Sequence, residues 1–300
     1  MKKLFCTLLS AAAAVALLCG FTPSPQENSA GAGLITKTYE TAEAISSLSV
    51  SDKYADVTVK ADDVDHVVVE YSYNSSYNDA FGTGGELYSF TIAGPSLNIQ
   101  GLKGDASMSV NNSKCICTMT VKLPRRAFAG LTVDTSNGNI TLQDMTSQSN
   151  TLTTTNGNIS ITGGSLDNLN ATANNGKVEV NNLLTQTFAA STRNGRISLA
   201  NTSALSITAQ AQNGSINLDT VSAPSYRCTV TNSSVVGKLV GRASDYAFDL
   251  TPGNGRVTVT DNTDSSFSLR SSGPVQQGQG AAQNFTAKAS NGSVNLEFLG

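Results

Sequence analysis

The second half of the chain repeats one pattern of apolar and polar residues every 19 positions. The dipeptide Asn-Gly marks the pattern at Asn137, Asn156, Asn175, Asn194 and Asn213, in steps of 19 residues. The series continues through Asn232-Ser233, Asn254-Gly255, Ser272-Gly273 and Asn291-Gly292. Internal repeats of this length are typical of solenoids, in which each unit stacks on the next. We count nine such units.

Apolar residues alternate with polar ones on both sides of each marker. The positions three residues after it hold Ile140, Ile159, Val178, Ile197, Ile216, Val235, Val257, Val275 and Val294. The positions six residues before it hold Leu131, Leu169, Phe188, Ile207, Tyr226, Phe248 and Phe285, and Phe267 lies five residues before Ser272. A period of two predicts β-strands, so each unit reads as strand, corner, strand.

The corner dipeptide by itself allows two folds. Asn followed by Gly tolerates positive φ at both positions, which ordinarily closes a two-residue hairpin. A constant period with matching columns instead favours stacking of unit on unit, with the Asn amides in a ladder and the Gly residues at a sharp bend. We expect this corner ladder at Asn137, Gly138, Asn156, Gly157, Asn175, Gly176, Asn194, Gly195, Asn213, Gly214, Asn254, Gly255, Asn291 and Gly292.

We therefore predict an all-β fold: a single-chain β-solenoid, a right-handed parallel β-helix with about nine rungs of 19 residues, after an irregular β capping region. The predicted divisions are an export signal over 1–21, a flexible linker over 22–33, the capping region over 34–130 and the repeats over 131–300. Strands are expected at Leu48 to Val59, Val67 to Tyr73, Leu87 to Ile92, Leu97 to Leu102 and Cys115 to Leu123. The last rung, with Val294 and Leu296, has two additional apolar residues, Phe298 and Leu299, which are expected to cover the far end.

The first residues have the form of an export signal. Lys2 and Lys3 precede an apolar run from Leu4 to Leu18 and a polar exit. The segment ending in Leu18-Cys19 is similar to a bacterial lipoprotein box, although that box has a small residue before the cysteine. We hypothesise that Cys19 carries a lipid; otherwise the leader serves export alone.

Low charge narrows the function classes. Only 14% of the residues are charged and the net charge is -3, which argues against coiled coils and charged disorder. A nucleic-acid partner would need a basic stripe to displace counterions, and the sequence has none.

Two runs resemble a known family. They are Met119-Thr120-Val121-Lys122-Leu123-Pro124 and Leu131-Thr132-Val133-Asp134-Thr135-Ser136-Asn137-Gly138-Asn139-Ile140-Thr141-Leu142. They resemble the bacterial putative-adhesin family of β-strand repeats, with its VxLP strand and repeated T-(S/N)-G-x-I-x-(L/I) units. The resemblance covers about Ile45 to Gly300 and implies a β-solenoid at the cell envelope. It brings no catalytic residues, and this chain prefers Asn-Gly to Ser-Gly at its corners.

Candidate chemistry is sparse outside the corners. Tyr71, Tyr73, Tyr77 and Tyr88 surround amides and a Gly-rich stretch, and such rings stack on sugars or pack half-buried beside a loop. Cys115, Cys117 and Cys228 are expected as small buried hydrophobes, and His66 as a turn residue. No metal or cofactor is expected.

Catalysis would need paired carboxylates on one face. Asp134, Asp144, Glu179 and Asp219 instead fall in different columns. Lys177, Arg193 and Arg196 gather at neighbouring corners, either as a site for an anionic glycan or as solubility charge.

We therefore expect a non-enzymatic adhesin or scaffold module, exported to the extracellular space or the envelope. Its expected partners are envelope or surface components, including glycans. A membrane would be reached only through the leader or a lipid anchor. The alternatives are a carbohydrate-binding module that uses the Tyr71–Tyr88 loop, and a glycan lyase or hydrolase of the β-helix class.

Overall fold

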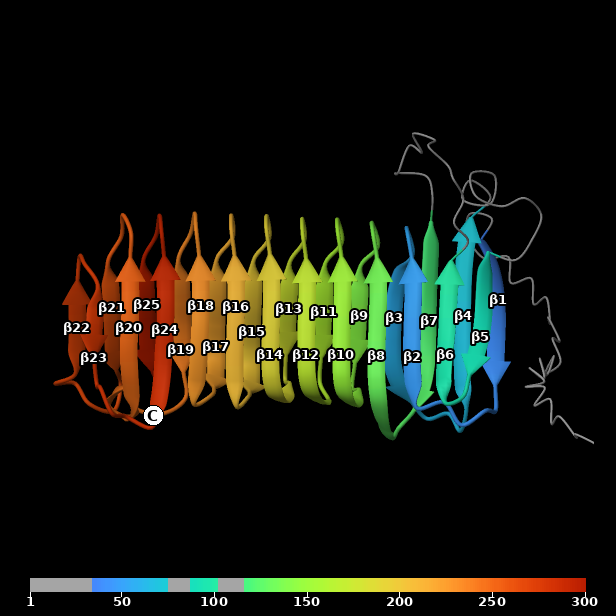
Figure 1. Cartoon of the computed structure of the whole chain (residues 1–300), viewed down its shortest axis with the longest axis horizontal. Helices are drawn as coiled ribbons and strands as arrows, with labels where there is room; N and C mark the ends of the chain where they lie inside the picture. The colour runs from blue at the N-terminus through green and yellow to red at the C-terminus, as the bar shows by residue number, and fades with distance from the viewer. Residues whose placement is uncertain (1–33, 75–86, 102–115) are drawn as a thin grey trace, which may run out of the picture.

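The computed structural model describes residues 34–74, 87–101 and 116–300, and over these residues it is a rod built of β-strands (Figure 1). The described part contains no α-helix, only the 3-10 turn η1 (Ala243–Asp245). The predicted all-β class is confirmed.

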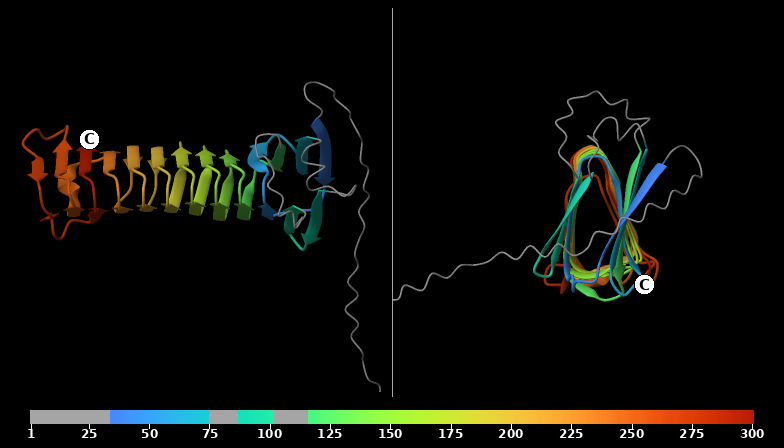
Figure 2. Two further views of the ribbon diagram at one scale, coloured as in Figure 1. Left: turned by 90° about the horizontal axis from the view of Figure 1, so that it is seen from above. Right: turned by 90° about the vertical axis from the view of Figure 1, so that its right-hand side faces the viewer.

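Two rows of strands run side by side along the rod and enclose its interior (Figure 2). In stacking order, the first row is β5 (Tyr88–Ala93), β6 (Ser96–Gly101), β2 (Ser47–Asp52), β8 (Ala127–Thr135), β10 (Thr146–Thr154), β12 (Ser165–Ala173), β14 (Leu184–Thr192), β16 (Ser206–Ala211), β18 (Ser225–Val230), β24 (Gln283–Ala289), β20 (Tyr246–Pro252) and β23 (Val275–Gln277).

The second row begins at the same end of the rod. In stacking order it is β1 (Leu34–Thr41), β4 (Val67–Asn74), β7 (Cys117–Pro124), β3 (Asp56–Asp62), β9 (Ile140–Gln143), β11 (Ile159–Thr162), β13 (Val178–Asn181), β15 (Ile197–Ser203), β17 (Ile216–Ser222), β19 (Val235–Leu239), β25 (Val294–Phe298), β21 (Val257–Asp261) and β22 (Ser268–Ser271).

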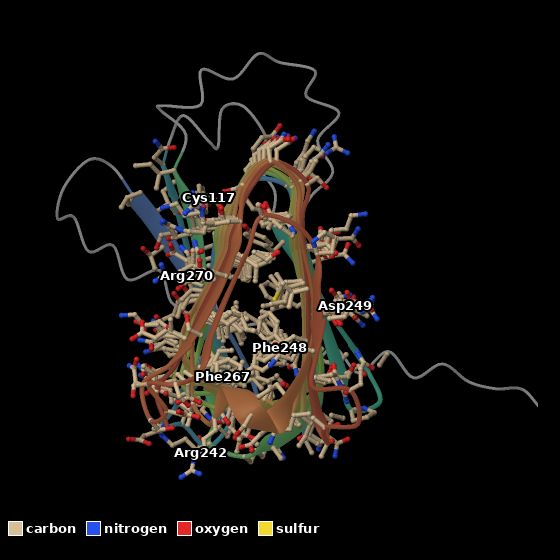
Figure 3. All side chains as sticks on the ribbon, turned by 90° about the vertical axis from the view of Figure 1, so that its left-hand side faces the viewer. Cys117, Arg242, Phe248, Asp249, Phe267 and Arg270 are labelled. Atoms are coloured by element: carbon tan, nitrogen blue, oxygen red, sulfur yellow. The ribbon has the colours of Figure 1, made fainter. Side chains whose placement is uncertain are left out.

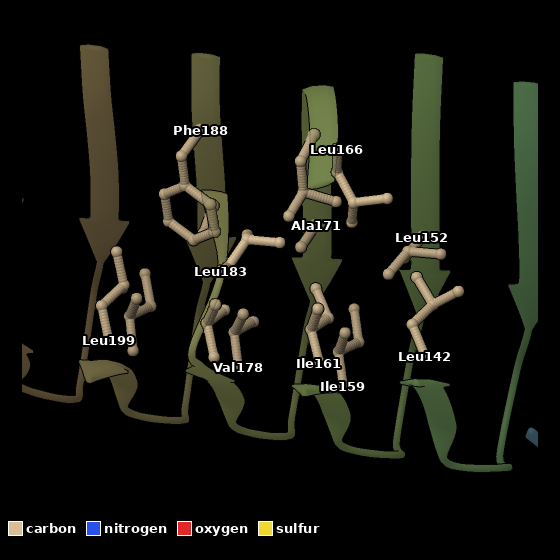
Figure 4. Packing of buried hydrophobic residues seen from close by; sticks show 14 of the residues in the cluster. Leu142, Leu152, Ile159, Ile161, Leu166, Ala171, Val178, Leu183, Phe188 and Leu199 are labelled. Carbon is tan, nitrogen blue, oxygen red and sulfur yellow. The ribbon is translucent and has the colours of Figure 1, made fainter. Parts of the chain in front are cut away.

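One strand of each row and the corner between them make a coil. In the middle of the rod, neighbouring coils pair in parallel with a shift of 19 residues, as in Leu152 beside Ala171 and Ile159 beside Val178. Residues of one sequence column therefore lie above one another, and their inward side chains form a continuous apolar core (Figure 4). A coil shares both its core and its backbone hydrogen bonds with its neighbours.

The coils do not stack in chain order at the C-terminal end. The last coil, β24–β25, lies between β18–β19 and β20–β21, and Figure 1 shows β24 between β18 and β20. Val294 and Leu296 point inward as expected, but Phe298 is an interior residue as well, and the expectation that it covers the far end is wrong. The inserted coil carries the same inward columns, so it fits this gap; its Phe285 stacks on Tyr226 with ring centroids 4.7 Å apart.

The predicted unit at Ser272-Gly273 does not form a rung. It lies in the turn between β22 and β23, which pair antiparallel with β21 and β20. The count of nine successive rungs along the repeats is therefore wrong at this unit. Strands of reversed direction close the end, and Phe267 packs partly buried against the core there (Figure 3).

The N-terminal end is built in a similar way. The predicted strand from Leu48 to Val59 is broken by a corner into β2 and β3, which stack directly on β8 and β9. Part of the predicted capping region is thus a coil of the rod itself. Beyond it, β4 and β5 pair antiparallel with β7 and β6.

One inward position departs from the apolar pattern. Asn150 is 2% exposed in a column otherwise occupied by residues such as Leu131 and Leu169. Its Nδ2 donates to the carbonyl of Asn168 at 3.0 Å, but its Oδ1 and the nearby Ser147 Oγ have no partner. Burial of these unpaired polar atoms lowers the stability of the fold locally within an otherwise apolar core.

Candidate functional site

The corner asparagines form a row of side-chain hydrogen bonds along the rod. From Asn156 onward, each Nδ2 donates to the Oδ1 of the preceding coil at 2.6 to 2.9 Å, whereas the Nδ2 of Asn137 donates to the backbone carbonyl of Lys53 at 3.2 Å. The order is Asn137, Asn156, Asn175, Asn194, Asn213, Asn232, Asn291 and Asn254. The amides thus follow the stacking order of the coils, including the inserted last coil.

The corner glycines serve a different purpose from the one expected. Neither they nor the asparagines have positive φ. A Cβ built on Gly176 would lie 1.7 Å from the carbonyl oxygen of Gly157, and one on Gly157 would lie 1.8 Å from that of Gly138. At these positions glycine leaves room for the close approach of the stacked backbones, and Ser233 is the exception in the column.

Buried threonines hold the same corners from inside. The Thr154 hydroxyl accepts the N–H of Gly157 and donates to the carbonyl of Gly138, both at 3.0 Å. Thr135 and Thr192 occupy the same column and make equivalent contacts in their coils. In the sequence these threonines form one inward column that Ala173 and Ala211 interrupt, and the period by itself does not indicate their hydrogen bonds to the corners.

The opposite side of each coil has a second corner, where the positive φ values occur. Asp144, Asn182, Asn201 and Thr220 have φ between 48° and 57°, and Gly163 has 69°. These residues are 19 apart and form one column. Asn, Asp and Gly adopt this region readily, whereas the β-branched Thr220 is strained there.

The tyrosines named as ligand contacts belong to the core. Tyr71, Tyr73 and Tyr88 are 2 to 4% exposed, and the rings of Tyr71 and Tyr88 meet edge to face at 4.8 Å. No open ring face is left for a sugar, so this burial removes the three side chains from the candidate ligand contacts. Tyr77 lies outside the described residues, as do Cys19 and Cys115.

Both described cysteines, Cys117 and Cys228, are buried. Burial raises the pKa of the Cys228 thiol to about 12, so it stays protonated and unreactive at neutral pH.

Within the described ranges, no three His, Cys, Asp or Glu side chains are grouped so as to hold a metal ion. In the same ranges, no helix has the length and apolar character to cross a membrane.

Most charged groups near the N-terminal end are paired at the surface. His66 contacts Asp65 through Nδ1 and lies 3.5 Å from Glu40 Oε2 through Nε2. The hydrogen bond to Asp65 is the main reason that the pKa of His66 is raised, and Glu40 adds to it. Arg125 bonds Asp63 at 2.8 Å. These ion pairs join turn residues at the surface to one another and to Glu40 of β1.

The basic residues expected at the third and fourth corners are partly balanced. Lys177 Nζ and Arg196 Nη2 both lie 3.9 Å from Glu179 Oε1. Glu179 therefore offsets the positive charge of this group, which weakens it as a site for an anion.

An open groove of about 590 Å³ lies at the C-terminal end of the rod, where β22 runs antiparallel to β21. Its lining combines two arginines with small polar residues: Asn254, Gly255, Arg256, Thr258, Arg270, Ser271 and Ser272. Neither arginine has a carboxylate within 4.0 Å among the described residues. This groove is the candidate binding site. It was missed because it forms where an antiparallel strand replaces the next coil, a change that the repeat period does not signal.

Comparison with known proteins places the chain in a family. The model of the Toastrack DUF4097 family matches residues 45–297, whereas a search of curated proteins finds no match.

Three similar solved structures cover 89% of this chain and 97% of their own. They are proteins named putative adhesins from Bacteroides fragilis NCTC 9343 (14% identity, TM-score 0.44) and Parabacteroides merdae ATCC 43184 (12%, 0.47), and one named a putative lipid binding protein from Parabacteroides distasonis ATCC 8503 (11%, 0.48). Since the family match spans the rod from β2 to β25, the chain belongs to the Toastrack DUF4097 family.

Proposed function

We propose that this chain is a non-catalytic adhesion or scaffold module at the cell envelope or outside the cell. The observation that supports it best is the closed rod, in which coils stack from end to end and antiparallel strands lie over both ends. Such a stack has little internal freedom and holds surface side chains at fixed spacings. A right-handed winding of the coils is part of the proposal, because right-twisted parallel strands favour right-handed crossovers.

The absence of catalysis is part of this proposal. The carboxylates weighed for hydrolysis lie on separate elements: Asp134 is in β8 of the first row and Glu179 in β13 of the second. An enzymatic role as a glycan lyase or hydrolase therefore has less support, as does sugar binding through the buried Tyr71 and Tyr88. Incubating the purified chain with acidic and neutral polysaccharides should release no new reducing or unsaturated ends.

The proposed location is the cell surface, reached through the leader over 1–21, with Cys19 as a lipid anchor. The proposed partners are envelope or surface components, including glycans. Nucleic acid is not among them, and a membrane is contacted only through the leader or the anchor. An N-terminal anchor would present the opposite end of the rod, which carries β20 to β23, away from the membrane.

The location can be tested with an epitope inserted into the turn at Gly278 to Gly280, between β23 and β24. In cells that produce the full chain, antibody should label intact cells, and removal of the chain should lower their attachment to a surface. Labelling only after permeabilisation would contradict surface display. Loss of membrane fractionation in Cys19→Ala would support the lipid anchor, and unchanged fractionation would reject it.

A further inference from the structure

We propose that the C-terminal groove binds an acidic polysaccharide by holding one of its carboxylate or sulfate groups between Arg256 and Arg270. The inference deepens the proposed adhesion function, on which it rests, by naming the surface that makes contact and the chemistry of its ligand. The geometry of β21 and β22 and the charges around these strands support the proposed binding.

The two strands place both arginines on one outer face. Thr258 lies opposite Arg270 in the antiparallel pair, and Val257 and Val259, on either side of Thr258, point into the core. Arg256 precedes Val257, so it shares the outer face with Thr258. Arg256 and Arg270 are then diagonal neighbours, about 7–8 Å apart at the backbone. Two long guanidinium side chains at this separation reach a single anion between them.

Charge compensation in the groove is weak. Within the described ranges, Arg256 and Arg270 have no ion pair, whereas Arg196 in the middle of the rod lies near Glu179. Asp249 of β20 lies on the opposite outer face from Arg270 (Figure 3). Glu297 accepts a hydrogen bond from Asn262 at 2.9 Å. The groove is therefore a local positive site on a chain of net charge -3.

The remaining lining favours a ligand that also carries hydroxyl groups. Asn254 is the last amide of the corner ladder; its Nδ2 donates to Asn291 Oδ1 at 2.9 Å. In the described part of the chain no coil lies beyond it to donate to its Oδ1, which can accept from a sugar hydroxyl. Thr258 and Ser272 add hydroxyls, and the lining contains no aromatic ring. Recognition would therefore depend on charge and hydrogen bonds rather than on stacking, as suits an acidic sugar.

The test is binding of the purified full chain to immobilised polygalacturonate, which carries carboxylates, dextran sulfate, which carries sulfate esters, and neutral dextran. The key variant is Arg256→Gln with Arg270→Gln. Its matched control is Arg193→Gln with Arg196→Gln, which removes the same charge in the middle of the rod. Ser272→Glu adds a carboxylate beside the arginines without touching the core. Thermal unfolding checks that all variants keep the fold.

We expect binding to at least one acidic polymer and none to dextran. The groove double variant and Ser272→Glu should each weaken binding roughly tenfold or more, because charged hydrogen bonds are lost or competed away. The control should stay within about twofold. The acidic polymer that binds identifies carboxylate or sulfate as the recognised group.

Three results would overturn the inference: no binding to either acidic polymer, equal binding to dextran, or equal loss in the control. None of them would affect surface labelling or cell attachment, so the adhesion proposal would stand or fall separately.

Discussion

At the scale of single residues, the rod depends on positions where stacked backbones leave no space. The corner glycines are such positions, since the carbonyl of the preceding coil occupies the place of a Cβ. The second corners are another kind, since their backbone has positive φ. The Asn-Gly dipeptide indicated the first corner from sequence, but its ordinary association with positive φ pointed to the wrong cause.

Gly176→Ala should destabilise the chain by about 2–3 kcal/mol or more, because the new methyl group would meet the Gly157 carbonyl at 1.7 Å and force the coils apart. Gly273→Ala is the matched control, since a Cβ there meets nothing within 4 Å. Urea unfolding of both variants measures the difference. Equal stability of the two would show that the corners are not closely stacked.

Thr220→Asn should stabilise the chain by about 0.5–1 kcal/mol, because Thr220 has φ 57° and a β-branched residue is strained there. Asparagine already occupies this column at Asn182 and Asn201. Thr208→Asn, in the regular strand β16, serves as the control and should give no gain. If Thr220→Asn melted at a lower temperature than the unmodified chain, backbone strain at Thr220 would be contradicted.

At the scale of elements, the 19-residue period predicted the strands, their inward columns and the Asn ladder. It could not predict which coils are neighbours at the ends. The units at Asn254 and Asn291 carry the same columns, so either could follow the coil at Asn232. The unit at Ser272 keeps the apolar Val275 but has the polar Gln277 two residues later, and its strands reverse direction. The groove arises from that reversal and was therefore also beyond the reach of the pattern.

Because buried threonines of one column hydrogen-bond to the corner glycines, we predict that Ala173→Thr stabilises the chain by about 1 kcal/mol. Ala173 lies between Thr154 and Thr192 in one column, and the new hydroxyl would bond the Gly176 N–H and the Gly157 carbonyl. Thr135 and Thr154 already stack in adjacent coils, so the column accepts neighbouring threonines. Ala173→Val has the same shape without the hydroxyl. Denaturant unfolding should show a gain for Thr only; an equal gain for Val would mean that packing alone is responsible.

The edge strand β1 should respond to pH through His66. Asp65 and Glu40 raise the pKa of His66 above its usual 6.5 in the folded chain. The stabilising contribution is therefore complete below the unfolded pKa and is lost as pH rises through the folded value. Hydrogen exchange of β1, corrected for intrinsic rates, should show more protection at pH 5.5 than at pH 8.5. His66→Asn should remove that difference, and its persistence would assign the effect to another group.

For the whole molecule, the order in which the coils stack decides which coil lies inside the rod and where the groove forms. The chain travels outward to β20–β23 and returns, so that its last coil lies inside the rod and the groove of Arg256 and Arg270 lies at the end. Antiparallel strands cover both ends, where an open parallel edge would otherwise invite association with other chains.

The most direct test of this order is disulfide formation between outward positions, in a chain whose five native cysteines are replaced by alanine. Thr286 of β24 pairs with Arg227 of β18 on one side and with Asp249 of β20 on the other. Arg227 and Asp249 are then two strands apart, about 9.6 Å, which is beyond disulfide reach. Oxidation should link Arg227→Cys to Thr286→Cys readily and leave Arg227→Cys with Asp249→Cys open. A disulfide between positions 227 and 249, with none between 227 and 286, would mean that the coils stack in chain order and would contradict the account.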